Sequence, residues 1–69
     1  MKRIGVNSSN IKSVGYDVQK KILEVEFYSG GTYQYSNVPK EVYFRFIKSE
    51  SLGKFLHTNI KGIYKYKKV

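Results

Sequence analysis

Three consecutive segments of alternating apolar and polar residues, joined by short loops, constrain the fold of this chain most strongly. The segments are residues 11–19, 22–28 and 32–38. Alternation with a period of two is typical of a half-buried β-strand, because successive side chains point to opposite faces of a sheet. The loops between them, residues 20–21 and 29–31, are long enough only for hairpins between antiparallel neighbours. We therefore predict a three-stranded antiparallel meander.

The register of this meander follows from pairing apolar side chains with each other. The first loop pairs Tyr16 with Val25 and places Val18 on the same face. The second loop pairs Val25 with Tyr35. A slip of one residue would turn all of these side chains to the opposite face. The outward face then holds three of the chain's five acids and no cation; its residues are Asp17, Gln19, Glu24, Glu26, Thr32, Gln34 and Ser36.

Two helices follow the predicted strands. Pro39 suits the first turn of a helix, where its missing N–H is not needed, and Ser51 is a candidate N-cap for a second helix that stops near Gly62. The predicted fold class is α+β: a three-stranded antiparallel β-meander followed by two helices packed on one face, with a short extended C-terminal tail over residues 63–69. The apolar faces of the helices are Val42, Tyr43, Phe46 and Ile47, then Leu52, Phe55, Leu56 and Ile60.

Length and composition narrow the possible classes of protein. The 69 residues suffice for one domain, 1–69, and the absence of cysteine excludes disulfides and thiolate metal sites. A hydrophobic content of 41% is too high for a disordered tail. No apolar run approaches the roughly 20 residues that cross a bilayer, and residues 1–6 lack the apolar centre of a signal peptide. We expect a cytoplasmic protein that has no membrane partner.

The sequence lacks a catalytic constellation. The single histidine, His57, has no cysteine or carboxylate pair near it in the chain with which to form a metal site or a triad. Glu24 and Glu26 are typical of the solvated face of a strand, and Gly30 precedes a strand rather than the helix that a phosphate-binding loop requires. We therefore predict that the protein is not an enzyme and uses no metal and no cofactor.

The order of short motifs resembles that of the KTSC domain family, named for a domain at the C-terminus of some lysyl-tRNA synthetases. The resemblance extends from about Ser8 to Tyr66, and it departs from the family pattern at residues 54–57. It implies a free-standing small protein of this family, and it implies RNA binding, which has been suggested from the synthetase fusion. The motifs are Ser8-Ser9-Asn10-Ile11, Val14-Gly15-Tyr16-Asp17, Leu23-Glu24-Val25-Glu26-Phe27, Gly31, Tyr33-Gln34-Tyr35, Val38-Pro39 with Val42-Tyr43, and Ser51-x-Gly53.

Charge points to the class of partner. Thirteen Lys and Arg residues against five Asp and Glu residues give a net charge of +8, which attracts polyanions. In the predicted fold these cations avoid the outward sheet face and gather on the helices and the tail. The candidate nucleic-acid-binding residues are Lys40, Phe44, Arg45, Lys48, Lys54, Lys61, Tyr64, Lys65, Lys67 and Lys68.

Two aromatic features have two interpretations each. Phe44 lies between Lys40 and Lys48 at four-residue spacing, where it can either stack on a base or cover the second helix. Tyr33 and Tyr35 can either stack on bases or lie in the core. The leading functional hypothesis is a non-enzymatic module that binds nucleic acid, RNA in preference to DNA, with low sequence specificity. The alternative is a protein–protein adaptor, of phage or mobile-element origin, that docks on an acidic partner.

Overall fold

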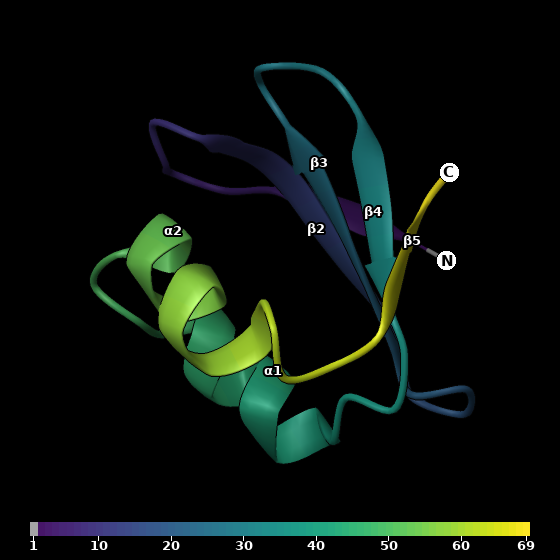
Figure 1. The fold of residues 1–69 in the computed structure, drawn as a ribbon. Helices are drawn as coiled ribbons and strands as arrows, with labels where there is room; N and C mark the ends of the chain where they lie inside the picture. The colour runs from purple at the N-terminus through teal and green to yellow at the C-terminus, as the bar shows by residue number, and fades with distance from the viewer. Residues whose placement is uncertain (1) are drawn as a thin grey trace.

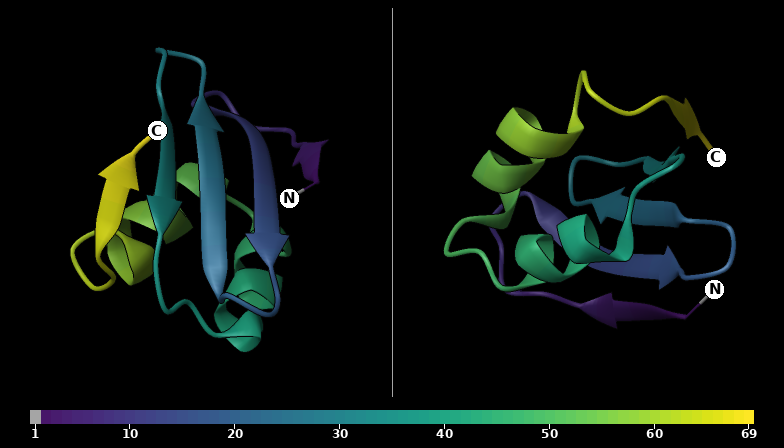
Figure 2. Two further views of the ribbon diagram at one scale, coloured as in Figure 1. Left: turned by 90° about the vertical axis from the view of Figure 1, so that its right-hand side faces the viewer. Right: turned by 90° about the horizontal axis from the view of Figure 1, so that it is seen from below.

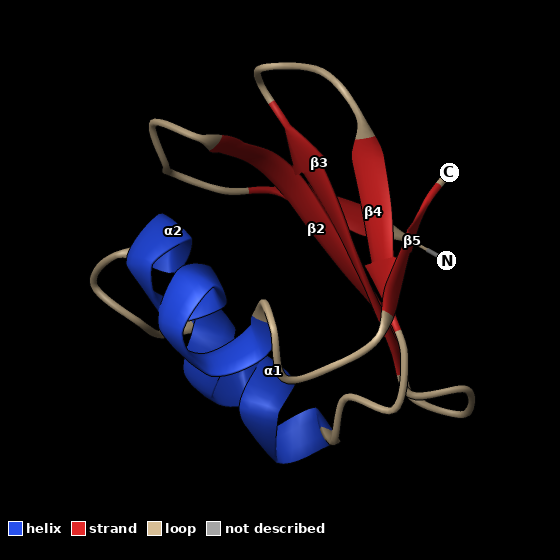
Figure 3. Cartoon of the chain, in the orientation of Figure 1, coloured by secondary structure: helices blue, strands red, loops and turns tan. Residues whose placement is uncertain are grey.

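A five-stranded antiparallel sheet is covered on one face by helices (Figure 1). The computed structural model describes residues 2–69. The sheet has the strand order β1-β2-β3-β4-β5, and the helices follow β4 in the chain (Figure 3). The strands are β1 (Arg3–Gly5), β2 (Ile11–Asp17), β3 (Ile22–Phe27), β4 (Thr32–Tyr35) and β5 (Tyr66–Lys68); the helices are α1 (Lys40–Ile47), α2 (Leu52–Phe55) and the π-helical η1 (Leu56–Ile60).

The predicted α+β class is correct, but the predicted number of strands is wrong. The central meander β2-β3-β4 gains an edge strand on each side, β1 beside β2 and β5 beside β4. Each edge strand has three residues: β5 lies within the predicted extended tail, whereas β1 was not predicted. They are defined by their pairing, which sets Ile4 opposite Val14 and Tyr66 opposite Tyr35.

The first hairpin turn is longer than predicted. Tyr16 pairs with Leu23, so the turn comprises residues 18–21, and the predicted core position of Val18 is wrong because this side chain is 62% exposed. The Asp17 carboxylate accepts hydrogen bonds from the backbone N–H groups of Gln19 and Lys20, both at 3.0 Å, and this turns the chain before a two-residue loop can form. The register differs by two residues from the prediction, and a shift of two keeps Val14 and Tyr16 on their predicted face. Ile11 is an exception, because an irregularity between Ile11 and Ser13 places it opposite Phe27 and buries it.

The second hairpin has the predicted loop length at a different position. Its three loop residues are 28–30, because the backbone N–H of Phe27 donates to the carbonyl of Gly31 and that of Gly30 donates to the carbonyl of Phe27, both at 3.1 Å. Gly30 has a φ of 102°, the left-handed conformation that this loop requires. Tyr33 pairs with Val25, so both tyrosines of β4 lie on the core face, as predicted.

The core lies between this face of the sheet and the helices. Phe46, on the predicted apolar face of α1, is fully buried, and the Ser51 hydroxyl caps α2 by accepting the N–H of Lys54 at 3.3 Å. Tyr16 stacks on Tyr43 of α1 with ring centroids 4.7 Å apart, and its hydroxyl donates to the carbonyl of Val38. The buried residues are Ile11, Val14, Leu23, Val25, Tyr35, Val38, Phe46, Leu52, Leu56 and Ile60.

The helices cover only part of the inner face of the sheet. They lie behind the end of the sheet that carries the β2–β3 turn, and the β3–β4 hairpin projects beyond them (Figure 2). After Phe55 the second helix widens, because the N–H of Lys61 donates to the carbonyl of Leu56 at 2.7 Å, five residues earlier. The uncovered part of the inner face includes Tyr33 and Tyr66, which line an open groove.

Candidate nucleic-acid interface

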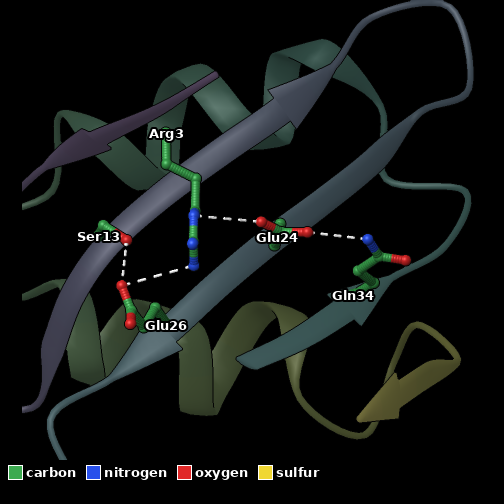
Figure 4. Close-up of polar contacts among 5 residues, drawn as sticks. All are labelled: Arg3, Ser13, Glu24, Glu26 and Gln34. Carbon is green, nitrogen blue, oxygen red and sulfur yellow. Dashed lines mark hydrogen bonds and ion pairs between the residues drawn. The ribbon is translucent and has the colours of Figure 1, made fainter. Parts of the chain in front are cut away.

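The outward sheet face differs in charge from the prediction. Arg3, brought there by β1, forms ion pairs with Glu24 (Nε to Oε2, 3.3 Å) and Glu26 (Nη1 to Oε1, 3.4 Å) (Figure 4). Lys67 lies on the same face, because it pairs with Gln34. The expectation of three acids and no cation on this face is therefore wrong, since both edge strands contribute a cation to it.

Hydrogen bonds complete this polar cluster. The Ser13 hydroxyl donates to Glu26 at 2.9 Å, and the Gln34 amide donates to Glu24 at 2.8 Å (Figure 4). Each carboxylate thus has a cation and a neutral donor as partners. The cluster joins β1, β2, β3 and β4, so a structural role accounts for it.

The remaining cations are exposed and available to contact a partner. Within residues 2–69, Arg3 is the only cation that forms an ion pair, and every lysine is exposed. Most of the net charge of +8 is therefore available on the surface.

One predicted group of site residues lies on α1. Lys40, Phe44 and Lys48 are all exposed, and the Phe44 side chain retains 48% of its accessible surface. Phe44 contacts the ring of Tyr43, with centroids 5.7 Å apart, whereas the aromatic contact between the two helices is made by Phe46 and Phe55. Of the two interpretations of Phe44, the structure thus favours the exposed ring. Arg45 lies beside this row, its guanidinium carbon 6.0 Å from the centroid of the Phe55 ring.

The other predicted residues lie on α2, after η1 and on the tail. Lys54 and Lys61 are exposed, and Tyr64 is half-buried against the core. The tail lysines Lys65, Lys67 and Lys68 are exposed beside β4. Figure 2 shows α1 behind β2 and η1 behind β4 and β5. The predicted residues therefore do not form one continuous surface, because Lys67 lies on the outward face of the sheet and the helices lie on the other face.

An open groove of about 670 Å³ separates the β3–β4 hairpin from α2 and η1. One wall is aromatic and belongs to the sheet; the other belongs to the helices, and within residues 2–69 no carboxylate lines either wall. The lining residues are Phe27, Tyr28, Ser29, Gly30, Tyr33, Tyr35 and Tyr66 from the sheet and hairpin, Gly53, Leu56, His57 and Lys61 from the helical side, and Ser9 and Asn10 from the loop before β2.

The rings of the groove support one another. Tyr33 packs edge-on against Phe27 with centroids 5.7 Å apart, and Tyr66 lies 5.6 Å from Tyr33 and 5.7 Å from Tyr35. Burial, with smaller contributions from Tyr66 and Tyr33, raises the pKa of the Tyr35 hydroxyl above its usual value. Both tyrosines of the motif line the groove and contact the core; Tyr35 is buried and Tyr33 is half-buried.

Sequence reasoning missed several groove residues, among them Asn10, Phe27, Tyr28 and His57. One signal was present, because Asn10 and Gly53 both belong to the motifs quoted above. In the structure they touch: a Cβ on Gly53 would lie 3.3 Å from the side-chain nitrogen of Asn10. A glycine at this position therefore lets the loop before β2 approach the start of α2.

Two searches of residues 2–69 bear on other kinds of site. No cluster of three or more His, Cys, Asp or Glu side chains is positioned to hold a metal ion. No helix in this range is long and apolar enough to cross a membrane.

Comparisons with known proteins agree with the family resemblance. The model of the KTSC domain matches residues 7–69. An uncharacterized protein of Stutzerimonas stutzeri is 44% identical over 61 residues, which cover 88% of this chain and 86% of that protein. A lysine–tRNA ligase of Trichormus variabilis is 36% identical over 61 residues, 88% of this chain but 11% of the ligase. The crystal structure of a KTSC domain protein from Yersinia pestis superposes with a TM-score of 0.96 at 40% identity, covering 99% of this chain and 96% of the other.

Proposed function

The chain belongs to the KTSC domain family, and from this membership we propose that it is a small non-enzymatic module that binds nucleic acid, RNA in preference to DNA. Binding uses phosphate contacts by exposed lysines together with stacking on exposed rings. Eleven lysines against two arginines suit point-charge contacts with phosphate more than bidentate reading of bases, so sequence specificity is low. Its expected location, the cytoplasm, remains a prediction.

One observation carries the proposal: within residues 2–69, no cation except Arg3 is paired with a carboxylate. A surface of unpaired lysines attracts a polyanion without first losing internal ion pairs. On α1 the open charge flanks the exposed ring of Phe44. Lysine and an adjacent ring are the two elements that single-stranded nucleic acid requires of its binding surface.

The relatives add support for RNA. Two of them are named lysine–tRNA ligase, and in each the similarity covers 11% of the ligase. A domain joined to a ligase of tRNA works beside RNA, so RNA is the polyanion that we propose. The alternative is an adaptor that docks on an acidic protein, which the same open charge favours.

The proposal is tested by fluorescence anisotropy with a labelled short single-stranded RNA over a range of salt concentrations. The logarithm of the affinity falls with the logarithm of salt by about 0.7 per phosphate contact. Replacing Lys40 and Lys48 with alanine lowers this slope by about 1.4 if both contact phosphate. The matched control replaces Lys2 and Lys12, which are exposed and belong to neither candidate group. Absence of binding at low salt contradicts the proposal.

The adaptor alternative has a distinct signature. Heparin and RNA displace one another from a nucleic-acid site, whereas a protein partner that remains bound after nuclease treatment identifies an adaptor.

A further inference from the structure

We propose that the groove between the β3–β4 hairpin and η1 receives one unpaired base of the bound strand, an inference that rests on the proposed function. Its site is the aromatic wall of Tyr33 and Tyr66, and Lys61 is the phosphate contact beside it. Sequence reasoning left Phe44 on α1 and the pair of Tyr33 and Tyr35 as candidate stacking rings. The inference places the base at Tyr33 and Tyr66 in the groove rather than on α1.

The shape and chemistry of the walls favour a flat ring. Tyr33 is held on one side by Phe27 and on the other by Tyr66, so little side-chain freedom remains to be lost when a base stacks. Tyr66 lines the groove and keeps 58% of its surface exposed, so this residue is accessible to a ligand. The volume of about 670 Å³ lies within the range of sites that enclose small organic ligands.

The charge of the groove favours an anionic ligand. Within residues 2–69 the lining contains Lys61 and no carboxylate. Lys68 adds a second cation near the hairpin, because it pairs with Tyr33 and its side chain passes close to Gly31. An aromatic wall flanked by two lysines is complementary to a nucleotide, which joins a flat base to a phosphate.

Asn10 supplies hydrogen-bonding capacity at the edge of the groove. Its side-chain amide takes part in none of the hydrogen bonds within residues 2–69, so both its donor and its acceptor are open. An amide placed beside a stacked base can pair with polar groups on the base edge.

The occupant must be single-stranded. In a duplex the bases are stacked inside the helix, and a groove walled by a hairpin and a helix cannot reach their faces. Bases in loops and single strands are splayed out and available for stacking on aromatic side chains.

Two exposed rings provide a matched pair of variants. Tyr66→Leu removes a ring that lines the groove, and Phe44→Leu removes the exposed ring of α1. Both side chains are about half exposed, so both variants should stay folded, which circular dichroism verifies. Affinity for a labelled short single-stranded RNA is measured at low salt by fluorescence anisotropy.

The inference predicts that Tyr66→Leu weakens binding about fivefold to a hundredfold with an unchanged salt slope, as expected for loss of a stacking ring. Phe44→Leu weakens it less, and Lys61→Gln lowers the slope by about 0.7. If RNA binds but only Phe44→Leu weakens it, the base stacks on α1 and the inference is wrong while the proposed function stands. If the unmodified protein does not bind RNA, the proposed function itself fails.

Discussion

Replacing Phe46 with alanine tests the packing of α1 on the sheet. Phe46 is fully buried and has the largest side chain among the fully buried residues. Truncation of a buried phenylalanine costs about 3–5 kcal/mol, because apolar contact is lost and a cavity remains. At about 0.05–0.15 kcal/mol per residue, a chain of 69 residues has a total stability of about 3–10 kcal/mol, so this one change removes a large part of it.

Phe27 is the comparison residue, since its side chain is half-buried and lines the groove. About half of the full loss, roughly 1.5–2.5 kcal/mol, is expected for Phe27→Ala. Urea denaturation followed by circular dichroism measures the stability of both variants. If Phe46→Ala does not fold, Phe46→Leu provides a folded variant, because it should cost less than about 1.5 kcal/mol. A larger loss for Phe27→Ala than for Phe46→Ala would refute this account of the core.

Two further predictions concern electrostatics. Arg3→Gln should lower the free energy of unfolding by about 1 kcal/mol, because it removes the ion pairs to Glu24 and Glu26. Salt screens partly exposed ion pairs, so the difference in stability from the unmodified protein should shrink in high salt. An unchanged difference would show that these charges do not contribute to stability. Burial raises the pKa of Tyr35 in the folded protein above 10.0, so as pH rises this tyrosine ionises first in the unfolded chain. The stability present below pH 10.0 is therefore lost as pH rises through the folded-state pKa. Thermal melts should show a smaller loss of stability for Tyr35→Phe over this pH range, and an equal loss would exclude Tyr35 as the cause.

Face assignment in the central strands was predictable because the side-chain period is two. Both hairpin registers differ from the prediction by two residues, so Val25, Tyr33 and Tyr35 still lie on the core face. The turns were not predictable from this pattern. The first depends on hydrogen bonds to the Asp17 carboxylate, and these place Val18 in solvent although it continues the apolar alternation.

The edge strands and the groove depend on tertiary structure. A three-residue strand such as β1 has no measurable period, and only its pairing with β2 brings Arg3 over Glu24. The charge asymmetry between faces was therefore overestimated. The aromatic alternation of β4 predicts which face its tyrosines occupy, but whether helices cover them depends on where α2 and η1 lie. The exposure of the lysines of α1 was predictable, because the local sequence determines both their spacing and the apolar face of the helix.

The central claim is that this KTSC domain binds single-stranded RNA in its aromatic groove, and an NMR titration of backbone amide signals at low salt tests it most directly. The account predicts saturable shifts centred on Tyr33, Tyr66 and Lys61. Shifts confined to Glu24, Glu26 and their neighbours on the outward sheet face, or no shifts at all, would contradict it.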